Sequence, residues 1–302
     1  MWKRRWFHVL ILALVFIGGA FYWLVMESDP LGEKPFSLDI AAIRHLANSM
    51  PGDKPSEIRV ERIASFTFPA AAIMAGDSWT QQTLPANSYQ LVFPDRTIVI
   101  DSAMSQEQAN AMGTTSGFDD AAYERMSKGL RAASLILITH EHPDHLGGAA
   151  AIAPQVIAQL RLTRQQVDNL DRSDPVTFPK AALSGYQPLE YDRAMAVAPG
   201  VVVIRSPGHT PGSQIIFVRT ANRNEVLFLG DVAWHIANVR EVRERPRLLT
   251  MAMREDRSEV MGELAALHGL SLAEPQIAIV PGHDGQVIDD LVEQKVMIHG
   301  FK

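Results

Sequence analysis

Apolar and polar positions fall in blocks along the chain, and the first apolar block is the longest. It runs without a charge from Trp6 to Met26, follows the basic residues Lys3 to Arg5, and ends before Glu27 and Asp29. About 20 helical residues, each rising about 1.5 Å, span the roughly 30 Å hydrocarbon core of a bilayer. Residues 1–28 are therefore predicted to form a transmembrane or signal segment.

Two fates are open for this segment. Aromatic residues near both ends and basic residues before it favour an uncleaved anchor whose basic end stays in the cytoplasm. The small residues Gly18 to Ala20 instead fit a signal peptide cleaved after them, although the apolar run continues beyond them. In both cases we expect the rest of the chain outside the cytoplasm, on the periplasmic side if the source is bacterial.

The remaining pattern predicts a linker, one helix and one α+β domain. Residues 29–56 hold a polar stretch and then apolar residues at near-helical spacing between Leu38 and Ser49. From residue 57 to 302, short apolar runs alternate with helical ones, of which 119–133 is the clearest, and a polar connection covers 76–88. The predicted strands cover 58–68, 89–93, 96–101, 134–140, 201–207, 213–219, 225–231 and 276–282.

Composition narrows the classes of partner. The chain is 47% hydrophobic and 21% charged, which is ordinary for a globular protein. Its formal charge of −6 offers no net attraction to nucleic acid, so no such partner is expected. The chain has no cysteine, which excludes disulfides and thiolate zinc sites.

Metal-ligand residues are concentrated in one short motif and three later positions. The motif THEHPDH is followed by PGH, LGD and PGH, each closing an apolar run at a glycine turn, as site residues at strand ends of α/β enzymes do. Imidazole and carboxylate are zinc ligands, and this set exceeds one tetrahedral site, so two metal ions are predicted. The predicted ligands are His140, His142, Asp144, His145, His209, Asp231 and His283.

The order and spacing of these residues resemble those of the metallo-β-lactamase-fold hydrolases, from about Glu57 to the C-terminus. The resemblance implies a four-layer αββα sandwich. It also implies that His140, His142 and His209 hold one metal, that Asp144, His145 and His283 hold the other, and that Asp231 bridges them. Two Zn²⁺ ions per chain, with Fe or Mn as alternatives, would then share a hydroxide that attacks a small-molecule substrate.

Supporting roles are expected for residues around these ligands. Asp144 and Asp231 are the catalytic candidates, because a carboxylate such as Asp144 could orient the hydroxide and pass its proton to the leaving group. Ligating imidazoles usually donate their second N–H to an acceptor, for which Asp101, Thr139 and Thr210 are the candidates. The other histidines lack motif context: His8, His45, His235, His268 and His299.

Two tryptophans are candidate substrate contacts. Trp79 lies in the polar connection, where the family often has a loop over the metals; closing a hydrophobic seam is the alternative. Trp234 stands three residues after Asp231, where lactonases of the family place a Tyr. The segment 234–253 mixes apolar residues with arginines, and it either borders the pocket or forms an amphipathic surface helix with solvated arginines.

The resemblance is greatest to the branch with acyl-homoserine-lactone lactonases and glyoxalase II thioesterases. Asp231 stands where true β-lactamases of the fold usually carry Cys or Ser, and His142 stands where the diiron electron-transfer branch has Glu. Hydrolysis of an ester, lactone or thioester is therefore expected. The alternatives are β-lactam hydrolysis, an iron-dependent sulfur dioxygenase and a non-catalytic metal-binding scaffold.

Overall fold

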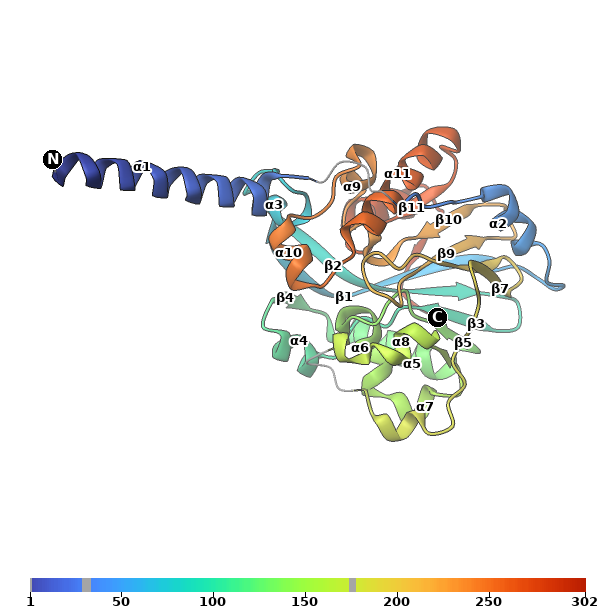
Figure 1. Cartoon of the computed structure of the whole chain (residues 1–302). Coiled ribbons are helices and arrows are strands. Elements are labelled where there is room, and N and C mark those ends of the chain that lie inside the picture. Colours follow the sequence, from blue (N-terminus) through green and yellow to red (C-terminus); the bar gives the residue numbers. More distant parts are fainter. Residues whose placement is uncertain (1, 29–33, 174–177) are drawn as a thin grey trace.

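The computed structural model describes residues 2–28, 34–173 and 178–302. A long helix projects from a body in which two β-sheets lie between layers of helices (Figure 1). This helix is α1 (Trp2–Phe21), which continues as the π-helical turn η1 (Tyr22–Met26). The stretch Arg5–Met26 is unburied and is long and apolar enough to cross a membrane. Its fate as anchor or signal stays a prediction, and the predicted linker residues 29–33 lie outside the described residues.

The first sheet has the strand order β12-β1-β2-β3-β5-β6, with β4 beside β1. Strands β1 and β2 form a long antiparallel hairpin, whereas β3, β5 and β6 run parallel to one another. The strands are β1 (Glu57–Pro69), β2 (Gln81–Val92), β3 (Thr97–Ile100), β4 (Thr115–Phe118), β5 (Leu135–Leu137), β6 (Leu160–Arg161) and β12 (Ile298–His299).

Strand β2 corrects the predicted connection between the first two strands. The sequence pattern places residues 76–88 in a loop, but 81–88 continue the strand back to Gln81, which pairs with Pro69. Leu84 lies opposite Phe66, and both side chains are buried. Backbone pairing with the long β1 satisfies the main chain of these polar residues, so tertiary context overrides their weak strand propensity.

The second sheet has the order β11-β10-β9-β8-β7. Strand β9 is antiparallel to both β8 and β10, and β10 is parallel to β11, so β8, β10 and β11 point the same way. The sequence pattern predicts four of these strands but not β7. The strands are β7 (Ala194–Ala198), β8 (Val201–Arg205), β9 (Gln214–Arg219), β10 (Glu225–Phe228) and β11 (Ala278–Val280).

Helices cover the outer faces of both sheets. The predicted helix at 119–133 is present as α5, where the Asp119 side chain accepts the Ala122 amide at 2.9 Å as an N-cap. The helix predicted between Leu38 and Ser49 is present as α2. The α-helices that follow α1 are α2 (Ile40–Ala47), α3 (Ala70–Ile73), α4 (Gln106–Met112), α5 (Asp120–Ala132), α6 (Pro143–Ala151), α7 (Ala153–Val156), α8 (Arg164–Asp168), α9 (Ile236–Glu241), α10 (Arg247–Ala252), α11 (Arg257–Ala273) and α12 (Gly285–Glu293).

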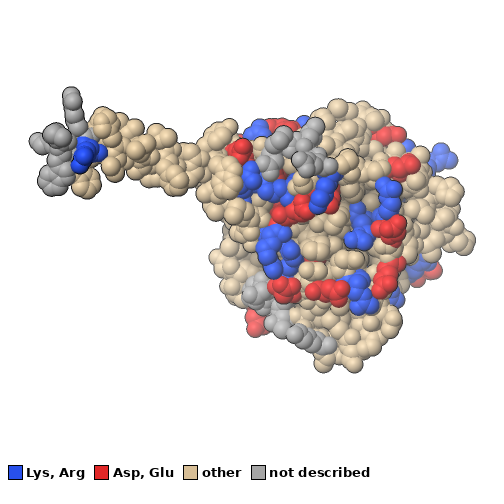
Figure 2. All heavy atoms as spheres, viewed as in Figure 1, with Lys and Arg blue, Asp and Glu red and all other residues tan. Residues whose placement is uncertain are grey.

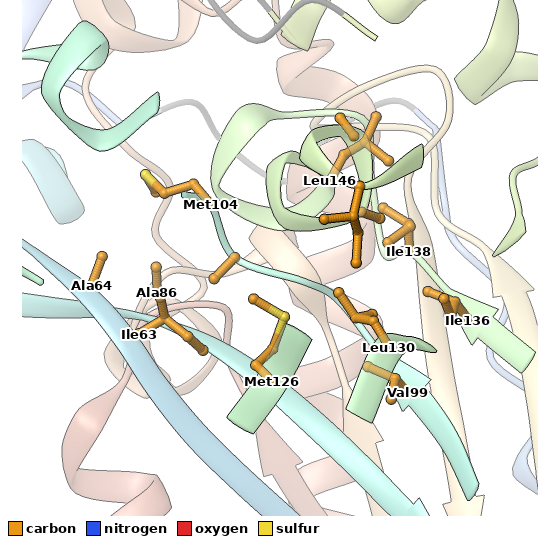
Figure 3. Packing of buried hydrophobic residues seen from close by; sticks show 14 of the residues in the cluster. Ile63, Ala64, Ala86, Val99, Met104, Met126, Leu130, Ile136, Ile138 and Leu146 are labelled. Carbon is orange, nitrogen blue, oxygen red and sulfur yellow. The ribbon is translucent and has the colours of Figure 1, made fainter. Parts of the chain in front are cut away.

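Three apolar clusters hold these layers together. In the cluster of Figure 3, Val99 and Ile136 of the first sheet meet Met126 and Leu130 of α5 and Leu146 of α6. A second cluster fills the space between the sheets, and a third packs α2, α9 and α11 on the second sheet. Each fully buried side chain of this size contributes about 1.5–3 kcal/mol. The predicted four-layer αββα sandwich is thus confirmed.

Candidate metal centre

The ends of several strands bring the predicted ligands to one edge of the sandwich. In the first sheet, β5 leads into the motif, in which His142 precedes α6 and Asp144 and His145 lie in its first turn. In the second sheet, β8, β10 and β11 run in the same direction and are followed by His209, Asp231 and His283. Side chains that follow codirectional strands meet at one edge, which is where open sheets carry their sites.

The ligand atoms form two groups that share Asp231. The first group holds His140, His142, His209 and Asp231, and in each group all ligand atoms lie within 4.8 Å of one another. Asp231 Oδ2 faces this first group, 3.7 Å from His140 Nε2 and 3.5 Å from His209 Nε2.

The second group holds Asp144, His145, Asp231 and His283. Asp231 Oδ1 faces it, 3.2 Å from His145 Nε2 and 3.1 Å from His283 Nε2. Asp144 Oδ2 completes the group at 3.4 Å from His283 Nε2. Asp231 Oδ2 also lies 3.3 Å from His283 Nε2, so this one carboxylate contacts both groups.

Acceptors behind the histidines turn their Nε2 atoms toward the site. His145 Nδ1 lies 2.8 Å from Asp101 Oδ2, His209 Nδ1 lies 2.8 Å from Glu255 Oε1, and His283 Nδ1 lies 2.9 Å from the Pro85 carbonyl oxygen. Carbonyl and carboxylate oxygens accept hydrogen bonds, so these imidazoles carry the proton on Nδ1. Such bonds fix the tautomer and leave Nε2 free to ligate.

Buried atoms without partners show that this residue set fits metal ions. Among the described residues, His140 Nε2, His145 Nε2 and Asp231 Oδ1 are buried and have no hydrogen-bond partner. Leaving such atoms unsatisfied costs about 1–3 kcal/mol each. Five imidazoles and two carboxylates aimed at two adjacent points suit divalent cations such as Zn²⁺.

The protonation of His140, His142 and Asp231 also suits ligation, whereas at His145 and His283 burial is outweighed by the charge of Asp231, which raises the pKa. Burial, reinforced by neighbouring imidazoles, lowers the pKa of His140 and His142 well below the usual value, which favours the neutral ligand form. Burial opposes the charged form of Asp231 as well, but His283, His145 and His140 outweigh it and hold its pKa well below the usual value. Asp231 is therefore an anion in the site.

The predicted supporting residues have different hydrogen-bond partners. Asp101, in a left-handed backbone conformation at φ 56°, accepts the Thr139 amide at 2.6 Å, the Thr139 hydroxyl at 2.8 Å and His145. Thr139 Oγ1 also lies 3.2 Å from His140 Nδ1. The Thr210 hydroxyl instead donates to Glu141 Oε2 at 2.8 Å. His235 N-caps α9 and faces Asp284, outside both ligand groups.

Sequence reasoning missed the buried pair behind His209. Glu255 accepts from His209 and from Arg245, whose guanidinium nitrogens lie 2.9 and 3.0 Å from Glu255 Oε1, and both side chains are buried. Burial raises the pKa of Glu255, but Arg245 more than offsets it, and the net shift is downward. Neither residue lies in a motif, so no spacing signal could have identified them.

An apolar cavity of about 450 Å³ opens above the two ligand groups. His142, Asp144, Asp231 and His283 contribute to its lining, Arg172 adds positive charge, and Arg254 lies there paired with Asp171. Its apolar lining residues are Phe66, Phe68, Leu84, Met112, Trp234, Leu249, Ala252 and Met253. The cavity therefore combines a polar floor with apolar walls.

The two tryptophans are placed differently. Trp234 lines the cavity, but its indole N–H donates to Asp231 Oδ2 at 2.8 Å, and its ring lies 6.1 Å from that of Phe68. Trp79 is exposed and is not among the residues that line the cavity. Segment 234–253 borders the cavity through Leu249 and Met253, and its Arg245 is buried rather than solvated.

An αββα sandwich with two His/Asp ligand groups at one edge of its sheets defines the metallo-β-lactamase class of folds. The family model of the metallo-beta-lactamase superfamily matches residues 82–290. The chain belongs to this superfamily.

Relatives within it act on lactones. The chain is 25% identical over 166 residues to an N-acyl homoserine lactonase from Bacillus thuringiensis, a match that covers 50% of this chain but only 65% of the lactonase. An N-acyl homoserine lactone hydrolase with N-hexanoyl-L-homoserine at its catalytic metal centre superposes with a TM-score of 0.61 and 18% identity, covering 78% of this chain and 96% of the other. A dizinc quorum-quenching lactonase superposes with a TM-score of 0.53 and 13% identity, covering 77% of this chain and 89% of the lactonase. At these identities the two structures show a shared fold.

Proposed function

We propose that this protein is a metal-dependent hydrolase that cleaves the acyl–oxygen bond of a lactone or ester, with a thioester as the nearest alternative. The observation that carries the proposal is the pair of ligand groups joined by Asp231 at the floor of an apolar cavity. Sequence relatives named as N-acyl homoserine lactonases support the choice of a lactone.

One Zn²⁺ would be held by His140, His142 and His209. The second would be held by Asp144, His145 and His283, and Asp231 would bind both ions. Metal ions bound there supply a water activated near neutral pH and a Lewis acid for the carbonyl oxygen. Asp101 and Glu255 orient the imidazoles of His145 and His209 through their Nδ1 atoms.

Cavity residues would bind and orient the substrate. Phe66, Phe68 and Leu249 form apolar walls for an acyl chain, while Arg172 suits a polar or anionic group of the substrate. Asp144 lines the cavity beside the second ligand group, where its carboxylate can accept a proton from the attacking water and pass it to the leaving oxygen.

Trp234 takes a different role from the Tyr at the matching position of the lactonases. Its single N–H donates to Asp231 Oδ2, so it has no second proton to offer a substrate carbonyl. We therefore assign Trp234 to orienting Asp231 and to the apolar wall of the cavity.

Helix α1 is proposed to stay attached as a membrane anchor with the catalytic domain outside the cytoplasm. The basic residues Lys3 to Arg5 precede the apolar stretch and acidic residues follow it, which is the polarity of a basic end held in the cytoplasm. The helix also continues without a break to Met26, beyond the possible cleavage position after Ala20.

The test is a substrate screen of the purified full chain in detergent against N-acyl lactones, esters, thioesters, phosphoesters and β-lactams, together with elemental analysis. We expect two metal ions per chain and fastest turnover of an acyl lactone or ester. His140→Ala and His209→Ala should abolish turnover while the fold is retained. A single metal after reconstitution with excess zinc, or turnover confined to β-lactams or phosphoesters, would overturn the proposal.

A further inference from the structure

The end of the proposed anchor helix is docked on the body of the protein. The Gly76 amide donates to the Val25 carbonyl at 3.1 Å, and Arg247 Nη2 lies 3.2 Å from Glu27 Oε2. The Arg247 guanidinium also lies 4.6 Å from the centre of the Trp23 ring. In Figure 1, α3 and α10 accordingly lie beside the end of the helix. These contacts fix which face of the body is nearest to the membrane that α1 would cross.

That face exposes large apolar side chains. Trp79 is 63% exposed, Leu248 56% and Met251 59%. Between residues 34 and 302, the only other large hydrophobic side chains that are exposed among those described are Met50, Leu272 and Ile298. Trp79 is three residues from Gly76, and Leu248 and Met251 lie on α10 beside Arg247. We call Trp79, Leu248 and Met251 the anchor-side face.

Helix α10 separates this face from the metal cavity. Leu248 and Met251 point to solvent, whereas Leu249 and, just after the helix, Met253 line the cavity. Residues three or four apart share a side of a helix, so α10 has one apolar side toward the cavity and a second that nothing in the described structure covers. The cavity is thus one helix away from the anchor-side face.

We propose that the anchor-side face rests in the interfacial region of the phospholipid bilayer that holds α1, and that the metal cavity receives amphiphilic acyl substrates from that bilayer. The inference depends on the proposed retention of α1 and on the proposed acyl hydrolase activity. The bilayer is the occupant that the structure favours, because the face is continuous with the end of an apolar helix and is held there by Arg247 and Gly76.

The composition of the surroundings agrees with an interfacial position. Exposed Tyr22 and Trp23 at the end of the helix and Trp79 on the body are residue types enriched at the membrane–water boundary. Arg243 donates to the Ala75 carbonyl and Arg247 pairs with Glu27, so basic side chains lie next to this face. Figure 2 shows charged side chains scattered over the body, while the helix is uncharged between its basic tip and the body.

The absence of cysteine from the chain allows a direct test with single labels. We would prepare the full chain with Met251→Cys, Trp79→Cys or Leu272→Cys, attach an environment-sensitive fluorophore, and insert each into phosphatidylcholine–phosphatidylglycerol vesicles. Leu272 is the matched control, because it is 71% exposed but lies away from the anchor. It is near the end of α11, beside Glu274, which pairs with Arg44 of α2. Lipids brominated along the acyl chain should quench the labels at 251 and 79 and leave the label at 272 unchanged.

Equal quenching of the labels at 251 and 272 would overturn the membrane contact, whatever the activity of the protein. Mass analysis of the membrane-bound chain separates this result from loss of the anchor, since a chain cleaved after Ala20 would overturn the anchor and this inference together.

A second measurement tests delivery of the substrate. The double variant L248D/M251D should slow hydrolysis of a long-chain ester embedded in the same vesicles by about tenfold, because two carboxylates oppose contact with an anionic surface. Its rate on a short water-soluble ester should be unchanged, as should both rates of Leu272→Asp. Equal slowing of both esters would overturn delivery from the bilayer, and no hydrolysis by the unaltered protein would overturn the proposed function instead.

Discussion

The buried pair Glu255 and Arg245 should control both the stability of the protein and its affinity for metal at the first ligand group. Replacing Glu255 by Gln keeps the volume of the side chain but removes its charge. The His209 Nδ1–H then donates to a neutral oxygen, and the buried Arg245 guanidinium loses its carboxylate partner at 2.9 Å.

The magnitudes follow from these two losses. Breaking a buried ion pair on one side costs about 3–5 kcal/mol, and the amide oxygen of Gln retains part of the contact, so a loss of about 3 kcal/mol is expected. Weakening the group behind a ligating histidine typically lowers metal affinity by about 10–100-fold. The two effects are separable, because only the second involves the metal.

Urea unfolding would report the first effect, and competition with a chromophoric chelator the second. Glu263→Gln is the matched control: burial raises the pKa of Glu263 to about 8, so this equally buried carboxyl is already neutral at pH 7. The control should not lower stability at pH 7, because folding no longer has to protonate a carboxyl that is ionised in the unfolded chain. The double variant R245M/E255Q should recover stability but not metal affinity, because it removes the unpaired charge of Arg245 without restoring a charged acceptor for His209.

The reasoning is refuted if Glu255→Gln binds metal as tightly as the unaltered protein does. It is refuted as well if Glu255→Gln and Glu263→Gln destabilise the fold equally at pH 7.

Three further outcomes are expected. Glu263 keeps its proton in the folded state up to about pH 8 but releases it near pH 4.5 in the unfolded chain. Stability should therefore fall as pH rises between those values, and Glu263→Gln should flatten that part of a stability–pH curve. A Cβ at Gly148 would meet a backbone carbonyl, so Gly148→Ala should destabilise the fold by about 1–3 kcal/mol or more in thermal unfolding. At Gly269 the space is open, so Gly269→Ala should stabilise α11 by up to about 1 kcal/mol. Trp234→Phe keeps the aromatic wall but removes the donor to Asp231, so kcat/KM should fall about tenfold, in line with about 1.5 kcal/mol for a bond to a charged group; unchanged kinetics would contradict that role.

Short-range information was enough to find the metal-ligand candidates. Three histidines and an aspartate within THEHPDH lie in one strand-end loop and the first turn of a helix, so their proximity follows from local geometry. The later ligands end apolar runs, and in an α/β fold strand ends that point the same way meet at one edge. The long apolar stretch before residue 27 likewise determines a helix by itself.

Contacts between distant segments decided the rest. Residues 81–88 look like a polar loop until β1 provides a partner for them. Glu255 supports His209 from 46 residues away, and Arg245 becomes buried only because Glu255 neutralises it. The side of α10 that meets the cavity depends on how the helix packs after Pro246. The sequence thus determined which residues could form the site, because strand ends and turns are local, whereas burial and charge pairing arise only when segments far apart in the chain come together.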